Sequence, residues 1–170
     1  QQRDAYWQHG SICEDYSVIT AATLAVGGWG DSYKNAVPQL VESLSAPVKG
    51  IVGPWVHKYP HFAVPEPRIG FLQEALRWWD KWLKGIETGV ENDPAYSVYL
   101  MDGVRPKTWY EKRAGRWINE HDWPQGPTQK SMYLGHWNTL ITEPAQINDI
   151  LSSPQTCGMS SGEYCAIWLG

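Results

Sequence analysis

Two residues that could carry out proton transfer, Asp31 and His57, occupy similar positions in the sequence. Asp31 ends the stretch "AVGGWGD" and His57 ends the stretch "IVGPWVH", so each follows an apolar run, a glycine and a tryptophan. A carboxylate that accepts a hydrogen bond from one ring nitrogen fixes the tautomer of a histidine, and the other nitrogen can then act as a general base. Such a pair could activate a nucleophile for acyl transfer.

A second histidine, His61, follows His57 by four positions and raises the alternative of a metal-ligand pair. Two histidines at this spacing share a face only when the segment between them is helical. Pro60 is unfavourable in a helix interior and favours extended geometry for Tyr59. We therefore expect no metal and no cofactor here, and we interpret His61 as a loop residue beside the site.

The segments around Asp31 and His57 predict the elements that would position them. Residues 23–28 and 47–53 are short apolar runs containing glycine, which is typical of buried strands that break into turns. Apolar residues at helical spacing between them, over residues 37–46, predict a helix. The order strand, helix, strand indicates a βαβ unit with parallel strands.

Parallel strands end at the same edge of a sheet, and open α/β folds bind their ligands at that edge. Adjacent strands lie about 4.8 Å apart, so the loops that follow them can bring Asp31 against His57. Taken alone, Asp31 could be a turn residue and His57 a structural histidine. Their order on consecutive strands favours a catalytic pair, because aspartate precedes histidine in the triads of α/β-hydrolases.

The clearest helix is predicted over residues 69–84 and is followed by Gly85, a typical helix stop. Its apolar stripe is wide, which predicts packing against a core rather than a cofactor site. The stripe consists of Phe71, Leu72, Ala75, Leu76, Trp78, Trp79, Trp82 and Leu83.

Beyond residue 94 the pattern changes from helices to strands. Residues 95–103 alternate like a strand, residues 108–120 predict two short strands around a turn at Gly115, and residues 131–135 predict another strand. Proline-rich joints separate these pieces. The change predicts a boundary near residues 88–94 between an α/β part and an all-β part.

These motifs together resemble the cocaine esterase / Xaa-Pro dipeptidyl-peptidase family of serine hydrolases. The resemblance rests on "GGWGD" (27–31), "GPWVH" (53–57), "FLQEALRWWDKWLKG" (71–85) and "YLMDG" (99–103). It implies that Asp31 and His57 are the acid and the base of a Ser-Asp-His triad. It also implies a small-molecule ester, amide or peptide substrate.

The resemblance implies an α/β fold class. Residues 1–90 would form the C-terminal portion of an α/β-hydrolase sheet, and residues 91–170 the start of an all-β jelly-roll domain. The family's nucleophile is a serine in a Gly-x-Ser-x-Gly type turn that precedes the aspartate and the histidine in the chain, and no such turn precedes Asp31 in this sequence. The segment "MSSGE" (159–163) comes closest, but it follows both Asp31 and His57. We therefore expect a fragment whose serine lies outside these residues and which is inactive alone.

The chain contains eleven tryptophans, which is an unusually high number for its length. Trp29 and Trp55 stand beside the two catalytic candidates and could line a substrate pocket or pack under the loops. Tryptophans also form sugar-binding platforms. The alternatives to a hydrolase are therefore a non-catalytic, Trp-rich β module that binds carbohydrate and a structural or assembly fragment of a larger complex.

The net charge and the cysteine content limit the classes of partner and the cellular location that we expect. The net charge is −4 and no block of Lys or Arg is present, which excludes nucleic acid and an anionic membrane as expected partners. The sequence has an odd number of cysteines, Cys13, Cys157 and Cys165, and none of them forms a C-x-x-C motif. This pattern favours reduced thiols and therefore a cytoplasmic location. An incomplete sheet exposes apolar surface, so we expect homo-oligomers or other association through that surface.

Overall fold

The computed structural model describes residues 3–105, 107–123, 130–136 and 139–148. Cys157, Cys165 and the segment 159–163 therefore lie outside the described residues. In chain order the elements are α1 (Ala5–His9), short 3₁₀ helices at Ile12–Glu14 and Tyr16–Val18, β1 (Thr23–Gly28), α2 (Ala36–Ser43), β2 (Val48–Gly53), α3 (Phe71–Lys84), a 3₁₀ helix at Val90–Asn92, β3 (Tyr96–Met101), β4 (Gly115–Glu120), β5 (Tyr133–Leu134) and β6 (Leu140–Ile141).

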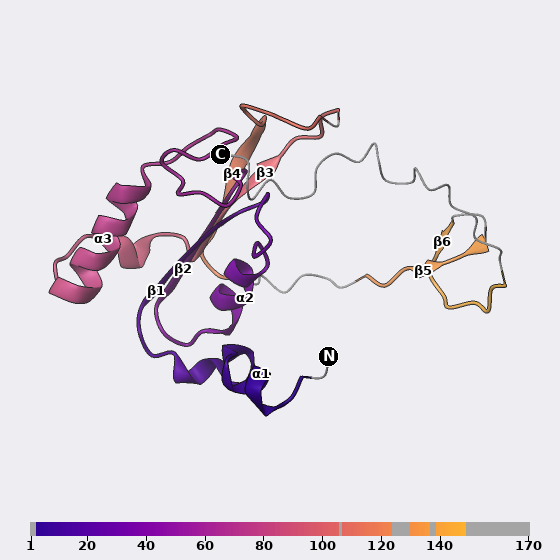
Figure 1. Ribbon diagram of the computed structural model, residues 1–170, viewed down its shortest axis with the longest axis horizontal. Coiled ribbons are helices and arrows are strands. Elements are labelled where there is room, and N and C mark those ends of the chain that lie inside the picture. Colours follow the sequence, from indigo (N-terminus) through magenta and orange to yellow (C-terminus); the bar gives the residue numbers. More distant parts are fainter. Residues whose placement is uncertain (1–2, 106, 124–129, 137–138, 149–170) are drawn as a thin grey trace.

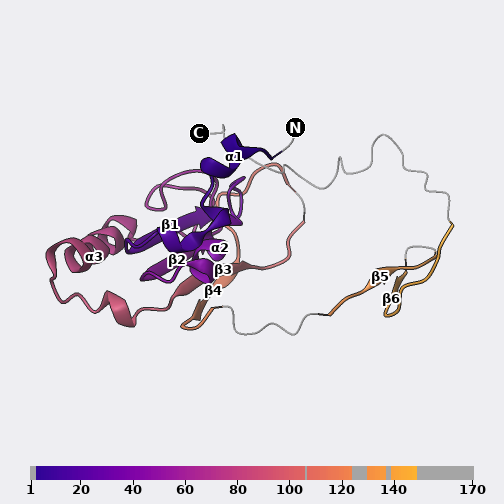
Figure 2. The same ribbon diagram turned by 90° about the horizontal axis from the view of Figure 1, so that it is seen from below.

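A four-stranded mixed sheet in the order β1-β2-β3-β4 forms the centre of the molecule, with α2 and α3 on opposite faces (Figure 1). β5 and β6 form a separate antiparallel pair that lies apart from this sheet in both views (Figures 1 and 2). The α/β character predicted from the sequence is confirmed. None of the described helices is long and apolar enough to cross a membrane.

The predicted βαβ unit is present. β1 and β2 are parallel and in register from Thr23 opposite Val48 to Gly28 opposite Gly53, and α2 forms the crossover between them. Gly50 lets α2 approach β2 closely, because a Cβ atom at this position would lie 2.5 Å from Cγ2 of Val41. The unit holds the carboxyl ends of both strands at one edge of the sheet.

Alternating side chains build a core on each face of the sheet. The face toward α2 buries Ala25, Val37, Val41, Val52 and Tyr96. The opposite face buries Ile51, Trp55 and Ala63, with Leu24 and Val26 packed against them. Both strands of the βαβ unit are therefore apolar on both sides, as parallel strands in α/β proteins are.

β3 and β4 continue the sheet across the boundary expected at residues 88–94. β3 is parallel to β2, with Gly50 opposite Tyr96, and β4 is antiparallel to β3. The buried ring of Tyr96 belongs to the same core as Val37 and Val41, which explains why this strand joins the first sheet. Among the described residues, the expected boundary does not separate two sheets.

The prediction of two strands around a turn at Gly115 is wrong. β4 begins at Gly115 itself, opposite Met101, and residues 108–113 contribute one isolated bridge between Lys112 and Glu66. A Cβ atom at position 115 would lie 2.2 Å from the backbone oxygen of Leu100. This glycine therefore permits close strand pairing rather than a turn between two strands.

The helix predicted over residues 69–84 is present as α3, and Gly85 ends it in the left-handed conformation with φ 69°. Its wide apolar stripe is only partly in the core, because Ala75 and Trp78 are its buried members. The exposed members are Leu72, Leu76, Trp79 and Leu83, with 54–78% of each residue accessible. The expectation that the whole stripe packs in a core is wrong for the part of the chain described, since the sheet covers one side of the stripe.

A group of four charged residues fastens α3 to the sheet. Nζ of Lys49, a buried residue of β2, lies 3.0 Å from Glu74 Oε2 and 2.5 Å from Asp93 Oδ2. Arg77 Nη1 lies 3.2 Å and 3.0 Å from the same two oxygens. Burial raises the pKa of Asp93, but hydrogen bonds from Arg77 and Lys49 outweigh this effect and hold the pKa below its ordinary value.

Candidate active site

The loops that follow β1 and β2 stay in contact beyond the last paired residues of the strands. The backbone N–H of Trp29 donates to the oxygen of Gly53 over 2.9 Å, and that of Gly30 donates to the oxygen of Trp55 over the same distance. These two bonds fix one loop against the other. Asp31 and His57 are the next polar side chains along the two loops.

Gly28 makes this approach possible. A Cβ atom on Gly28 would lie 2.1 Å from the backbone oxygen of Trp55, and one on Gly30 would lie 3.2 Å from it. Backbone atoms cannot move out of the way as a flexible side chain can. The glycines of the "GGWGD" stretch therefore set the distance between the loops.

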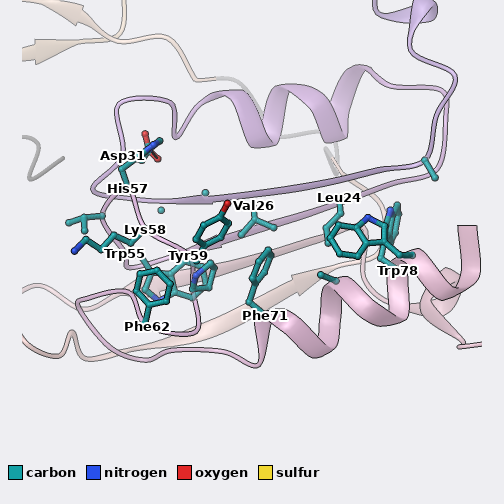
Figure 3. Close-up of a pocket in the computed structure, with 17 residues that line it drawn as sticks. Leu24, Val26, Asp31, Trp55, His57, Lys58, Tyr59, Phe62, Phe71 and Trp78 are labelled. Atoms are coloured by element: carbon teal, nitrogen blue, oxygen red, sulfur yellow. Dashed lines mark hydrogen bonds and ion pairs between the residues drawn. The ribbon is translucent and has the colours of Figure 1, made fainter. Parts of the chain in front are cut away.

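The structure brings the two predicted residues into direct contact. His57 Nδ1 lies 2.6 Å from Asp31 Oδ2 (Figure 3). Asp31 is 9% exposed, and its other oxygen, Oδ1, accepts from the backbone N–H of Tyr33 over 2.8 Å. The side chain of His57 is 55% exposed. The carboxylate is thus fixed and covered, whereas the imidazole reaches the surface.

The contact determines what the imidazole can do. An ionised carboxylate can only accept hydrogen bonds, so Nδ1 of His57 carries the hydrogen in this pair. Nε2 then has a free lone pair when the ring is neutral. Asp31 would stabilise the positive charge that forms when Nε2 takes up a proton. The arrangement is chemically suited to general base and general acid steps at Nε2.

A cavity of about 620 Å³ extends from Asp31 and His57 along β1 to α3. Figure 3 shows the two polar residues at one end and Leu24 and Trp78 at the other. Tyr59, Phe62 and Phe71 line the stretch between the ends. The cavity is therefore polar at the end that holds the imidazole and largely apolar elsewhere.

The two tryptophans predicted as pocket candidates lie in different places. Trp55 is 1% exposed, borders the cavity and donates from Nε1 to the oxygen of Pro67 over 2.7 Å. Trp29 donates from Nε1 to the oxygen of Tyr99 over 2.7 Å and packs against the core. Trp29 does not border this cavity, but it borders a second one described below.

His61 lies in an aromatic cluster rather than at the Asp31 carboxylate. Its ring is parallel to that of Phe71, with an interplanar angle of 5° and centroids 6.1 Å apart, and it makes an edge contact with Phe62 at 4.7 Å. Within the described ranges, no three His, Cys, Asp or Glu residues are arranged to hold a metal ion.

The sequence reasoning did not identify the aromatic wall formed by Tyr59, Phe62 and Phe71. The concentration of aromatic residues in "HKYPHF", directly after His57, was the available signal for the first two. Phe71 belongs to the apolar stripe of the following helix, and no local pattern indicates that it stacks on Tyr59 with ring centroids 5.8 Å apart.

The fold and these loops define an α/β protein with a carboxylate–imidazole pair at the carboxyl edge of its sheet. The family model of X-Pro dipeptidyl-peptidases (S15 family) matches residues 1–59. Two curated proteins, putative serine esterase Mb1866c of Mycobacterium bovis and putative serine esterase MT1883 of Mycobacterium tuberculosis, are each 26% identical over 136 residues. Each match covers 76% of this chain and 19% of the relative.

Among solved structures, SACOL2612, a CocE/NonD family hydrolase from Staphylococcus aureus, matches with a TM-score of 0.56 and 14% identity. The match covers 83% of this chain and 24% of that protein, and it shows a shared fold. The resemblance to the cocaine esterase / X-Pro dipeptidyl-peptidase family is confirmed. The chain spans about a fifth of the length of the curated relatives it matches.

Proposed function

We propose that this chain is part of a serine hydrolase that cleaves ester or amide bonds, and that Asp31 and His57 are the acid and the base of its Ser-Asp-His triad. The observation that carries the proposal is the 2.6 Å contact between His57 Nδ1 and Asp31 Oδ2 at the carboxyl edge of the sheet. The family resemblance supports the same class of reaction.

In the proposed mechanism, Nε2 of His57 takes the hydroxyl proton of the serine as its oxygen attacks the substrate carbonyl carbon. The imidazolium then returns this proton to the leaving alcohol or amine, and an acyl-enzyme forms. Water, deprotonated by the same nitrogen, attacks the acyl-enzyme and releases the acid and the free serine. Asp31 keeps the ring oriented and stabilises its positive charge in both halves.

We place the serine outside this chain. The contact that the structure gives for the His57 ring nitrogen Nδ1 is to the Asp31 carboxylate, and no Gly-x-Ser-x-Gly turn precedes Asp31 in the sequence. The curated relatives are much longer than this chain, which leaves room for the missing group. Without it no acyl-enzyme can form, so the 170 residues alone are inactive in this proposal.

The cavity is assigned two roles along its length. The end that contains His57 would receive the substrate, and the apolar end between β1 and α3 would be covered by a further part of the sheet. β1 supports this assignment because, among the described strands, it pairs with β2 alone and leaves its other edge open. Trp79, an exposed member of the α3 stripe, lines the same cavity, and the exposed stripe would promote association of the isolated chain.

A β-rich second part remains a proposal as well. We propose that the residues after β4 begin a jelly-roll domain, because β5 and β6 form an antiparallel pair separate from the main sheet. The strands β3 and β4 would then belong to the hydrolase part rather than to the second domain.

The proposed function can be tested with p-nitrophenyl acetate and an alanine p-nitroanilide. We expect hydrolysis by the longer protein that contains this chain, a large loss of kcat in His57→Gln, and none of this loss in His61→Gln. The purified 170-residue chain should be inactive. Hydrolysis by the chain alone that disappears in His57→Gln would show that the nucleophile lies within it and would overturn the proposed incompleteness.

A further inference from the structure

A second, smaller cavity of about 220 Å³ lies at the carboxyl edge of the same sheet. Gly30 and Val56, which directly precede the two residues of the Asp31–His57 pair, form part of its wall. Met101, the last residue of β3, forms another part. Ligands of open α/β sheets bind outside the carboxyl ends of the strands, so the position is suited to a binding site.

Two cations in the loop between β3 and β4 border this cavity. Cζ of Arg113 lies 5.1 Å from the centroid of the Tyr110 ring, and Nζ of Lys107 lies 5.5 Å from the same centroid. Neither cation has a carboxylate partner among the described residues, and no Asp or Glu lines the cavity. Two positive charges near one ring repel each other, and a bound anion would relieve this repulsion.

The guanidinium of Arg113 is held in place but is not saturated with hydrogen bonds. Its Nη2 donates to the backbone oxygen of Asp102 over 3.3 Å, whereas its Nε is buried without a hydrogen-bond partner. The backbone of Arg113 is fixed by donation to Glu66 over 2.9 Å and by acceptance from the hydroxyl of Tyr99 over 3.0 Å. A preorganised arginine with donors to spare is suited to a carboxylate.

Three aromatic side chains form a further part of the wall. Trp29 closes the side toward the core, and Trp109 and Tyr110 close the side toward solvent. The volume is below the usual range for drug-sized ligands, which limits the ligand to a small molecule. We propose that this cavity binds a small aromatic carboxylate, with its charge against Arg113 and Lys107 and its ring among the aromatic side chains. The proposal does not depend on catalysis by Asp31 and His57.

The probe for this site is 4-fluorophenylacetate, observed by ¹⁹F NMR with the 170-residue chain, and its neutral control is 4-fluorophenylacetamide. We expect the acid to bind in the millimolar range and the amide to bind about tenfold more weakly or not at all. Lys107→Gln and Arg113→Gln should each weaken binding of the acid about three- to tenfold. Lys112→Gln, in the same loop but outside the lining, should leave binding unchanged.

Circular dichroism would establish that each variant is folded, and Lys107→Gln is the safer variant because Lys107 is exposed. Loss of acid binding in this folded variant, with binding retained in Lys112→Gln, would support the site. Equal binding of the acid and the amide would overturn it. Binding that is insensitive to both Lys107→Gln and Arg113→Gln, or no binding by the folded parent chain, would also overturn it.

Discussion

Nδ1 of His57 and Oδ2 of Asp31 lie 2.6 Å apart although 26 positions separate the two residues in the chain. The contact exists because β1 and β2 end in register at Gly28 and Gly53, and because backbone hydrogen bonds keep the following loops together. The rigid sheet edge therefore holds an imidazole that is itself more than half exposed.

The first prediction concerns the carboxylate. In the longer protein, Asp31→Asn should lower kcat for ester hydrolysis by about 10⁴-fold, because an amide nitrogen facing Nδ1 would favour the wrong tautomer of His57. Steady-state kinetics at constant pH measure this effect. Asp122→Asn, a change at an exposed carboxylate, is the control and should retain parent activity. A similar small loss in both variants would remove Asp31 from the mechanism.

The second prediction concerns the close approach of the loops. Gly28→Ala should lower the free energy of unfolding by about 1–3 kcal/mol, because its Cβ atom would meet the backbone oxygen of Trp55. Urea denaturation measures this change. Gly103→Ala is the matched control, since a Cβ atom there meets nothing within 4 Å. If the two variants are equally stable, the loops are not packed as described.

The third prediction concerns acid. The pKa of Asp93 is lowered in the folded chain, so the stability from its bonds to Lys49 and Arg77 is complete above the ordinary aspartate pKa of about 4. This stability is lost as the pH falls through the lower folded value. Asp93→Asn should reduce stability at pH 7 and flatten its loss below about pH 4.

Urea denaturation at a series of pH values between 7 and 3 tests this prediction, with Asp122→Asn as the control for an exposed carboxylate. If the free energy of unfolding of Asp93→Asn falls between pH 4 and pH 3 as steeply as that of the parent chain, groups other than those that hold α3 to β2 determine the acid sensitivity.

The fourth prediction concerns the exposed face of α3. Leu76 and Trp79 are 54% and 55% exposed, and β1 has an open edge among the described strands, so the isolated chain should self-associate at micromolar concentrations. Leu76→Lys should raise the monomer fraction in sedimentation velocity. Gln73→Lys adds the same charge at an exposed polar position and should not. If both substitutions raise the monomer fraction equally, net charge rather than the apolar face controls association.

The sequence was sufficient to predict several local elements and the contact between Asp31 and His57. Strands β1 and β2, helix α3 and its stop at Gly85 follow from hydrophobic periodicity and glycine positions, which are local properties. The Asp31–His57 contact could be predicted because two consecutive parallel strands leave one arrangement for the loops that follow them.

Contacts between distant segments could not be predicted in this way. Nothing near Lys49 in the sequence indicates Asp93, 44 positions away, as its partner. The hydrogen bond from Trp29 to Tyr99 spans 70 positions, and it joins the first loop to a strand that the change of pattern assigned to another domain. Alternation identifies a strand but not the sheet that receives it, because pairing depends on the surfaces that other segments leave open.

The most direct test of the central claim is fluorophosphonate labelling of the longer protein, followed by intact mass and peptide mapping. The account predicts one adduct on a serine outside residues 1–170, labelling slowed by about 10³-fold or more in His57→Gln, and parent-like labelling in His61→Gln. A labelling rate that does not change in His57→Gln, or an adduct on the isolated chain, would contradict it.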